Sequence, residues 1–274
     1  MPSCSPGINP PRPPTPAPKG APDESGDHSS VSTVVVKPGD PQAVRELFEA
    51  IAPRYDQLND LLSLGLHRFW KRQALVWLRP RPGQRLLDLC CGTGDLALVM
   101  AERIRPGGTV LGLDAAEAPL AVARRRAADR PWLPLHFSRG DALATGLSDG
   151  WADGVAMAYG LRNLADPRAG LEEIRRLLRP GGRAAVLDFN RPEGSPGLPA
   201  AAAMASFQRF YLRHLVVPAA QVFGLPDQYA YLEASLQRFP TAGEQEALAR
   251  AAGFRTVRHR PLAAGLMGLL ELEA

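Results

Sequence analysis

The stretch Asp88-Leu89-Cys90-Cys91-Gly92-Thr93-Gly94-Asp95 decides the fold of this chain. It follows a short apolar run, Arg85–Leu89, and precedes an amphipathic segment, Leu96–Ile104, so it forms a glycine-rich turn between a strand and a helix. In an open α/β sheet, ligands bind beyond the carboxyl ends of the strands, where glycines let the backbone approach them closely. We therefore expect Asp88, Gly92 and Gly94 to bind a cofactor.

Strand and helix candidates alternate after this turn. The further strand candidates are Thr109–Leu113, Leu135–Ser138, Gly154–Ala158, Ala184–Leu187, Thr256–Pro261 and Met267–Leu272. The helix candidates are Glu117–Asp129, Gly170–Leu178 and Ala242–Ala252, and the second of them is expected to stop at Pro180-Gly181-Gly182. This alternation predicts a mostly parallel sheet that helices cover on both faces.

The chain divides into a leader and one domain. Residues 1–40 contain nine prolines between Pro2 and Pro22, a composition that buries little apolar surface and predicts disorder. Residues 41–274 are expected to form a single domain. Its parts are a helical cap (41–80, from periodic segments around Val44–Ile51 and Leu58–Leu78), a cofactor-binding core (85–190) and an insertion rich in alanine and aromatic residues (200–240).

Composition excludes several classes of protein. Three cysteines, of which Cys90 and Cys91 are adjacent, cannot form a disulfide framework, and five scattered histidines argue against a zinc site. No apolar run reaches the roughly 18 residues that span a bilayer. We expect a cytoplasmic protein, and peripheral contact with a thylakoid or plasma membrane stays open. The net charge of +4 selects no partner by itself.

Two more carboxylates follow the next strand candidates. Asp114 closes the second strand, where an acid can accept hydrogen bonds from both ribose hydroxyls of an adenosine. Asp141, in Gly140-Asp141-Ala142, ends the third, where an adenine amino group would lie. A helix cap, a turn or solvation explains each acid alone, but three at successive strand ends favour a nucleoside site. NAD is the competing cofactor, and Ala97 at the third glycine position of its motif disfavours it.

Three further groups of residues resemble the signatures of the ubiquinone/menaquinone biosynthesis C-methyltransferases. They are Phe48–Asp56 with Leu58-Asn59, Gly65–Arg68 and Trp70-Lys71; then Tyr159–Asn163; then Leu187–Pro192. The resemblance covers about residues 42–272. Pairs and triplets between Phe207 and Pro240 resemble the cyanobacterial and plastid branch of the family, which methylates 2-phytyl-1,4-naphthoquinol or its menaquinone equivalent.

This resemblance implies a fold, a cofactor and a substrate. The fold is that of class I S-adenosylmethionine-dependent methyltransferases, a Rossmann-like, mostly parallel seven-stranded sheet. The cofactor is S-adenosyl-L-methionine, with contacts implied from Thr93, Asp114, Asp141 and Ala142. Ala158, at the end of a strand candidate, is assigned to the same site. The substrate is a prenylated naphthoquinol.

Two positions depart from the family pattern. Pro119 stands where the family usually has a helix-forming residue, so we expect the start of that helix to be shortened or shifted. Thr145-Gly146-Leu147-Ser148 replaces a turn of the Leu-Pro-Phe-Pro type, so the loop beside the cofactor is expected to differ in shape.

Methylation of a quinol carbon requires alignment, exclusion of water and removal of one proton. Arg162 lies just past a strand end, but a guanidinium with a pKa above about 12 is no base. It can hold a water or stabilise the quinolate oxygen, with Tyr159 and Asn163 orienting it. A structural ion pair is the alternative role for Arg162.

The expected cap supplies further candidates. Tyr55, Asp56 and His67 can face the quinone, and the pKa of a histidine suits proton transfer. A satisfied helix histidine is the alternative for His67, and a core position for Tyr55. The insertion Ala200–Phe239 is expected to form an apolar wall for the isoprenoid tail or ordinary core, with Arg209 and Arg213 near anionic headgroups.

Other functions stay open. The chain could methylate ubiquinone-type benzoquinol precursors, or hold S-adenosylmethionine as a non-catalytic subunit of a complex. Nucleic acid is not expected, because the chain lacks an Asn/Asp-Pro-Pro-Tyr motif and a Lys-rich face with stacking aromatics. Homo-oligomerisation stays open.

Overall fold

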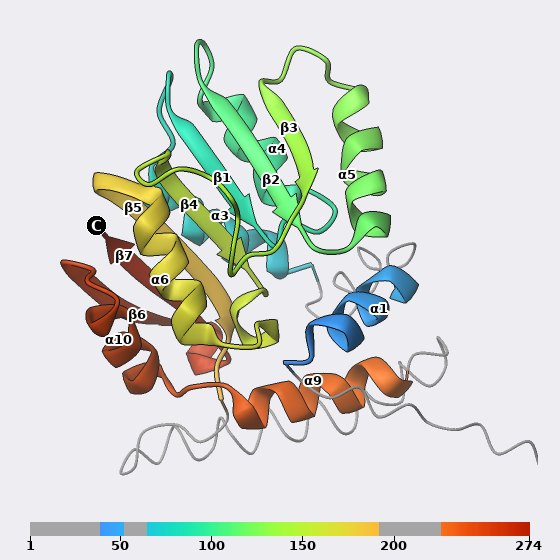
Figure 1. Ribbon diagram of the computed structural model, residues 1–274, viewed down its shortest axis with the longest axis vertical. Helices are drawn as coiled ribbons and strands as arrows, with labels where there is room; N and C mark the ends of the chain where they lie inside the picture. The colour runs from blue at the N-terminus through green and yellow to red at the C-terminus, as the bar shows by residue number, and fades with distance from the viewer. Residues whose placement is uncertain (1–38, 52–64, 192–225) are drawn as a thin grey trace, which may run out of the picture. The chain divides into compact units, whose positions relative to one another are not determined.

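The computed structural model describes residues 39–51, 65–191 and 226–274 (Figure 1). Within these ranges the elements are α1 (Pro41–Ile51), α3 (His67–Leu78), β1 (Arg85–Leu89), α4 (Asp95–Arg103), β2 (Thr109–Asp114), α5 (Glu117–Ala128), β3 (Leu135–Arg139), β4 (Ala152–Ala158), η2 (Leu161–Asn163), α6 (Pro167–Leu177), β5 (Leu178–Phe189), α9 (Pro226–Arg238), α10 (Ala242–Ala251), β6 (Thr256–Leu262), η4 (Ala263–Gly265) and β7 (Met267–Glu273).

The strands form one seven-stranded sheet in the order β3-β2-β1-β4-β5-β7-β6. Strands β1 to β5 pair in parallel, whereas β7 is antiparallel to both β5 and β6. The mostly parallel seven-stranded sheet expected from the sequence is therefore confirmed. Because β1 to β5 are parallel, their carboxyl ends meet at a single edge, and the turns that carry the predicted site residues follow those ends.

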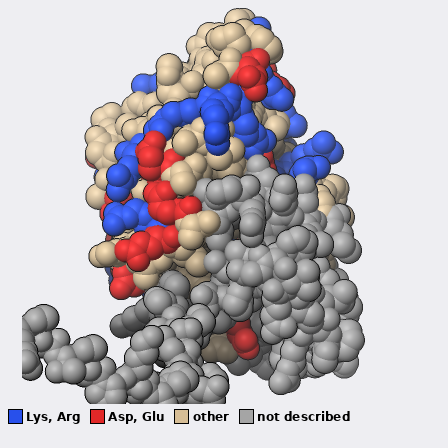
Figure 2. Space-filling model, turned by 90° about the vertical axis from the view of Figure 1, so that its right-hand side faces the viewer, with Lys and Arg blue, Asp and Glu red and all other residues tan. Residues whose placement is uncertain are grey.

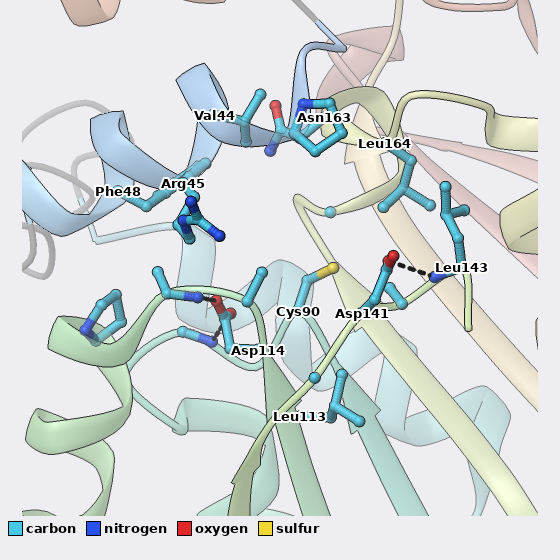
Figure 3. A pocket seen from close by; sticks show the side chains of 18 of the residues that line it. Val44, Arg45, Phe48, Cys90, Leu113, Asp114, Asp141, Leu143, Asn163 and Leu164 are labelled. Atoms are coloured by element: carbon cyan, nitrogen blue, oxygen red, sulfur yellow. Dashed lines mark hydrogen bonds between the residues drawn. The ribbon is translucent and has the colours of Figure 1, made fainter. Parts of the chain in front are cut away.

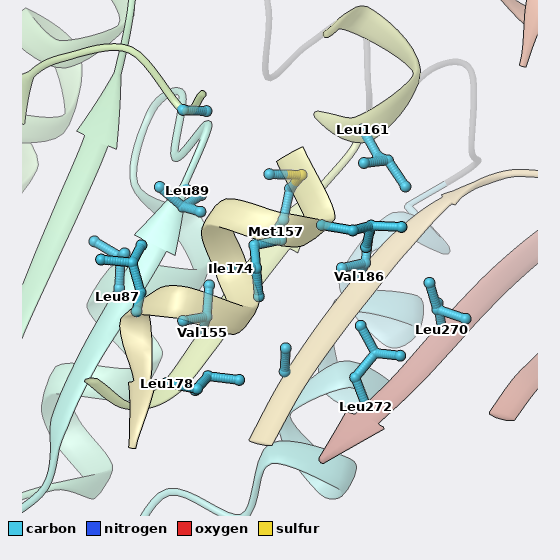
Figure 4. Packing of buried hydrophobic residues seen from close by; sticks show 14 of the residues in the cluster. Leu87, Leu89, Val155, Met157, Leu161, Ile174, Leu178, Val186, Leu270 and Leu272 are labelled. Carbon is cyan, nitrogen blue, oxygen red and sulfur yellow. The ribbon is translucent and has the colours of Figure 1, made fainter. Parts of the chain in front are cut away.

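The two faces of the sheet bury different side chains. Successive residues of a strand point to opposite faces, so Leu87 packs with Ile174 of α6, whereas its neighbour Leu86 packs with Leu75 of α3. Figure 4 shows the first face, where side chains of β1, β4, β5 and β7 meet α6. Helices α3 and α4 cover the second face. The central strands β1 and β4 are buried on both faces, which explains their near-continuous apolar runs.

Helix α6 starts three residues before the predicted segment and ends one residue earlier. Asp166 accepts hydrogen bonds from the N–H groups of Arg168 and Ala169, and Pro167 occupies the first helical position. The predicted end of the helix before Pro180-Gly181-Gly182 is confirmed to within one residue. Helix α6 ends at Leu177, and β5 continues from Leu178 through the Pro-Gly-Gly turn, with a register shift against β4.

Helix α5 begins at Glu117, as predicted, and a shift of this start relative to the family pattern stays a prediction. Pro119 is the third residue of α5. The N–H groups of a first turn have no acceptor inside their own helix, so a proline there removes no helical hydrogen bond.

The two N-terminal helices lie in different places. Helix α1 lies at the carboxyl edge of the sheet (Figure 1). Helix α3, which the sequence places in the same cap, packs instead on the face of the sheet, where Trp70, Ala74 and Leu75 join the core. The apolar stripe of α3 is wide enough to bury one whole side of the helix, and this explains the difference.

Charges of both signs mix on the face that carries α5, as Figure 2 shows. Arg124 pairs with Glu117, and Arg130 pairs with Glu102. None of the helices in the described ranges combines the length and apolar character needed to cross a bilayer. Tyr55, Asp56, Arg209, Arg213 and most of the predicted insertion lie outside the described residues.

Candidate active site

A cavity lies between the carboxyl edge of the sheet and α1 (Figure 3). Val44, Arg45 and Phe48 line it from α1, while Asp114 faces it from the end of β2 and Cys90 from the turn after β1. Further lining residues come from the loop after β3 and from the end of β4 and the turn after it: Asp141, Ala142, Ala158, Tyr159 and Asn163. Predicted site residues from four different strand ends therefore meet in one cavity.

Asp114 is held in place by backbone donors. Its Oδ2 accepts a hydrogen bond from the N–H of Gly92 at 2.8 Å, and its Oδ1 accepts one from Ala116 at 3.0 Å. Burial raises the pKa of Asp114, against the lowering effect of these two hydrogen bonds. Each carboxylate oxygen keeps a second lone pair, so a pair of neighbouring hydroxyls on a ligand can still bind.

The loop after β3 is anchored at two points. Asp141 accepts a hydrogen bond from the N–H of Leu143 at 2.8 Å. Glu173 of α6 accepts hydrogen bonds from the N–H of Thr145 at 3.0 Å and from its hydroxyl at 2.6 Å. Arg176 also binds Glu173, at 2.7 Å. Thr145, one of the departures from the family turn, thus ties this loop to α6.

A second, smaller cavity adjoins the first, and both are lined by Cys90, Gly92, Ala158 and Tyr159. The second cavity is polar: Lys71, Asp88, Thr93 and Asp95 also line it. The Nζ of Lys71 lies 2.8 Å from Asp95, which also binds Arg126 at 2.7 Å. A cation and several acids therefore meet within one small space.

The two acids of this cavity titrate in opposite directions. Burial raises the pKa of Asp88 to about 7, although Lys71 and a hydrogen bond from Ala97 oppose it. Burial also acts to raise the pKa of Asp95, but Lys71 and Arg126 together lower it to about 2. Asp95 opens α4, and the side chain of Asp88, which belongs to β1, accepts a hydrogen bond from Ala97 in the first turn of that helix, where dinucleotide enzymes bind pyrophosphate. The negative charge of Asp95 repels a pyrophosphate there.

The glycines of the turn serve different purposes. Gly92, with φ 54°, lines both cavities. Gly94 lines neither, and a Cβ on it would lie 2.7 Å from Cζ of Phe137. Packing against Phe137 and a φ of 83° explain why this position is a glycine, and a contact of Gly94 with the cofactor stays a prediction.

The turn after β4 is strained and held by charge. Tyr159 has φ 63°, in the left-handed region, and its carbonyl accepts hydrogen bonds from Nη1 of Arg162 at 2.9 Å and Nδ2 of Asn163 at 2.8 Å. Nη1 of Arg162 also lies 2.6 Å from Oδ1 of Asp188 at the end of β5. These bonds stabilise a conformation that costs a tyrosine about 1–3 kcal/mol.

Helix α9 contacts the same turn. The hydroxyl of Tyr231 donates to Oδ1 of Asn163 at 2.9 Å, and burial raises the pKa of this tyrosine to about 12. Nη2 of Arg238 donates to the carbonyl of Leu164 at 2.7 Å. The amide of Asn163 therefore has a fixed orientation, with oxygen toward α9 and nitrogen toward Tyr159.

Comparison with known proteins identifies the group to which this site belongs. A sequence model of the ubiE/COQ5 methyltransferase family matches residues 36–270. The chain belongs to this family. It is therefore a methyltransferase, and S-adenosyl-L-methionine is its methyl donor.

Curated relatives agree with this assignment to the ubiE/COQ5 family, and solved structures share the fold. A 2-phytyl-1,4-naphtoquinone methyltransferase of Synechococcus elongatus is 48% identical over 85% of this chain and 98% of its own. A chloroplastic 2-phytyl-1,4-beta-naphthoquinone methyltransferase of Arabidopsis thaliana is 40% identical over 82% of this chain and 85% of its own. A SAM-dependent methyltransferase structure from Aquifex aeolicus shares the fold, with a TM-score of 0.53, 16% identity and coverage of 85% and 98%.

Two residues that were predicted to take part in the methyl transfer line neither of the two cavities. Arg162 is buried against Asp188 and lines neither cavity. His67 is 4% exposed at the start of α3 and also lines neither. No role in the site was predicted for Lys71, Asp95 or Asp188, and Tyr231 was predicted only as part of the apolar wall formed by the insertion. For Asp95 a signal existed, because an acid that opens a helix directly after the glycine turn must face the same edge.

Proposed function

We propose that this chain transfers a methyl group from S-adenosyl-L-methionine to a ring carbon of a demethylated prenyl-naphthoquinol. Two findings together support the proposal. The structure has two adjoining cavities, and relatives that are up to 48% identical are named as phytyl-naphthoquinone methyltransferases. The larger cavity suits a nucleoside and the smaller one suits a zwitterionic amino acid.

The residues that line the two cavities fit the methyl donor. The lone pairs of Asp114 suit a ribose, and Asp141 with the backbone of Ala142 suits an adenine edge. In the smaller cavity, Lys71 suits a carboxylate, while Asp88 and Thr93 suit an ammonium group. Burial keeps the thiol pKa of Cys90 well above its usual value, so this thiol between the cavities stays neutral.

The donor, when bound, supplies an electrophilic methyl group on a sulfonium that joins its two halves. That centre belongs where the cavities meet, beside Ala158 and Tyr159. A quinol whose hydroxyl has lost its proton carries negative charge on the ortho carbon and is then the nucleophile. Alignment of two bound reactants can contribute about 7–11 kcal/mol to the rate enhancement.

We assign Arg162 a positioning and electrostatic role. Its ion pair with Asp188 and its bond to the carbonyl of Tyr159 hold the turn that borders both cavities. Its charge also favours an anionic quinolate nearby. Tyr55, Asp56 and His67 stay as proposed contacts of the quinone, with His67 as the proposed proton carrier.

The isoprenoid tail of the proposed substrate requires contact with a bilayer. We place this contact on the outer side of α3, where Leu66, Phe69 and Val76 are exposed by 50%, 54% and 61%. They share one side of the helix with Arg72, and cations beside apolar side chains favour an anionic membrane surface.

One assay tests the function. Purified protein receives labelled S-adenosylmethionine and either demethylated naphthoquinol or a ubiquinone-type benzoquinol, under reducing conditions. We expect label on the naphthoquinol ring. Label only on benzoquinol would support the alternative substrate, and donor binding without label on either would support a non-catalytic subunit.

A further inference from the structure

The start of α5 lacks a cap of its own. Its N-cap residue is Ala116, which has no side chain able to accept a hydrogen bond. The four free N–H groups of a helix start need acceptors elsewhere. Asp114 takes the N–H of Ala116, and Pro119 has none. The N–H groups of Glu117 and Ala118 remain.

Glu49 of α1 supplies the missing cap. Its Oε1 accepts a hydrogen bond from the N–H of Glu117 at 2.6 Å, and its Oε2 accepts one from Ala118 at 2.8 Å. A carboxylate on two backbone donors at a helix N-terminus is favoured both by charge-assisted hydrogen bonds and by the helix dipole. The cap thus comes from a residue far away in the sequence.

This bond joins the two walls of the larger cavity. Pro41, Val44, Arg45 and Phe48 share one side of α1 and line the cavity, at spacings of three and four residues. Ala115, Ala116 and Pro119, at the start of α5, line it opposite them. In Figure 3, Val44, Arg45 and Phe48 of α1 lie on the far side of the cavity from Asp114.

We propose that Glu49 is a positioning residue, which caps α5 from α1 and so holds α1 over the nucleoside half of the donor site. The inference rests on the proposed donor site. Because α1 forms one wall of the larger cavity, breaking this cap should increase the rate at which the nucleoside of the donor or of its product, S-adenosylhomocysteine, dissociates.

The test compares Glu49→Gln with Glu46→Gln. Glutamine keeps the size of the side chain but loses its charge and one acceptor. Glu46 is a matched control on the same helix, since it is exposed and accepts a hydrogen bond from Gln42 within α1. The measurements are hydrogen exchange of residues 41–51 without ligand, and the dissociation rate and Kd of S-adenosylhomocysteine.

For Glu49→Gln we expect faster exchange in 41–51, roughly tenfold faster dissociation and roughly tenfold weaker binding, while Glu46→Gln matches the wild type. The KM for the donor should rise with kcat at saturation nearly unchanged. Glu49→Ala should show the same pattern more strongly. Faster exchange with unchanged binding would overturn the proposal and leave Glu49 a purely structural cap. A wild type that binds no S-adenosylhomocysteine would instead remove the donor site itself.

Discussion

The backbone of Tyr159 is held in a left-handed conformation by hydrogen bonds that its carbonyl accepts from Arg162 and Asn163, and Arg162 is itself held by Asp188. Gly160 must be glycine for a related reason: a Cβ there would lie 2.8 Å from Cβ of Cys90. Two family signatures, around Tyr159 and around Asp188, are therefore halves of one buried interaction.

Arg162→Ala removes one partner of the Arg162–Asp188 pair, whose side chains are 10% and 3% exposed. We expect the free energy of unfolding to fall by about 3–5 kcal/mol, because Asp188 is left as an uncompensated buried charge. Turnover should fall by about 10²–10³-fold, while the Kd of S-adenosylhomocysteine stays close to that of the wild type. Chemical unfolding, kinetics and calorimetry measure the three effects.

Arg168→Ala is the matched control. Arg168 pairs with Glu172 on the surface of α6, so its replacement should leave the free energy of unfolding close to that of the wild type. Unchanged turnover of folded Arg162→Ala on a naphthoquinol would remove Arg162 from the catalytic machinery.

Asp88 makes stability depend on pH. Its pKa is about 7 in the folded protein, whereas the ordinary value for an aspartate is 3.8. The folded state therefore keeps a proton that the unfolded chain releases. The stability from this group is present below pH 4 and is lost as pH rises toward 7. Between pH 5 and 7, the wild type should lose about 2–3 kcal/mol more than Asp88→Asn, as measured by urea unfolding. Parallel profiles of the two proteins would refute the role of Asp88.

At the scale of elements, helices fix the loops that border the cofactor site. Helix α9 binds the turn after β4 through Tyr231 and Arg238. Helix α6 binds the loop after β3 through Glu173, whose pKa stays below its usual value because the hydrogen bonds of Arg176 and Thr145 outweigh the effect of burial. The positions of α6 and α9 thus determine the positions of the loops that line the cavity.

Glu173→Gln tests this dependence. Glutamine can still accept a hydrogen bond from Thr145 but loses the charge that binds Arg176. We expect the loop with Asp141 to loosen and the Kd of S-adenosylhomocysteine to rise about 3–10-fold. Glu172→Gln, the neighbouring residue on the same helix, should bind as the wild type does. Calorimetry that found the two variants alike would exclude a link from α6 to the cofactor.

At the scale of the whole molecule, the proposed membrane contact makes a separate prediction. Replacing Leu66 and Phe69 together by serine should weaken binding to vesicles that contain anionic lipid about tenfold, since part of the burial of two large apolar side chains is lost. Trp132→Ser is the control, because Trp132 is equally exposed but lies between α5 and β3. Cosedimentation measures both, and equal binding of all three proteins would place the contact elsewhere.

Most of the fold could be predicted because its signals are local. The start of β1 at Arg85, of α5 at Glu117 and of β7 at Met267 all coincide with predicted starts. Apolar runs, a glycine-rich turn and helical periodicity each act within a few residues. The same locality placed Asp114 and Asp141 at strand ends, and parallel pairing then brings such ends together.

The sequence by itself determined the order of strands and helices, the glycine turn and the edge at which the acids gather, because neighbouring residues decide these features. Only the tertiary structure decided which distant side chains meet: Arg162 with Asp188, Glu49 with the start of α5, and Gly94 with Phe137. Such contacts depend on packing between elements far apart in the chain, and no short pattern of residues encodes them.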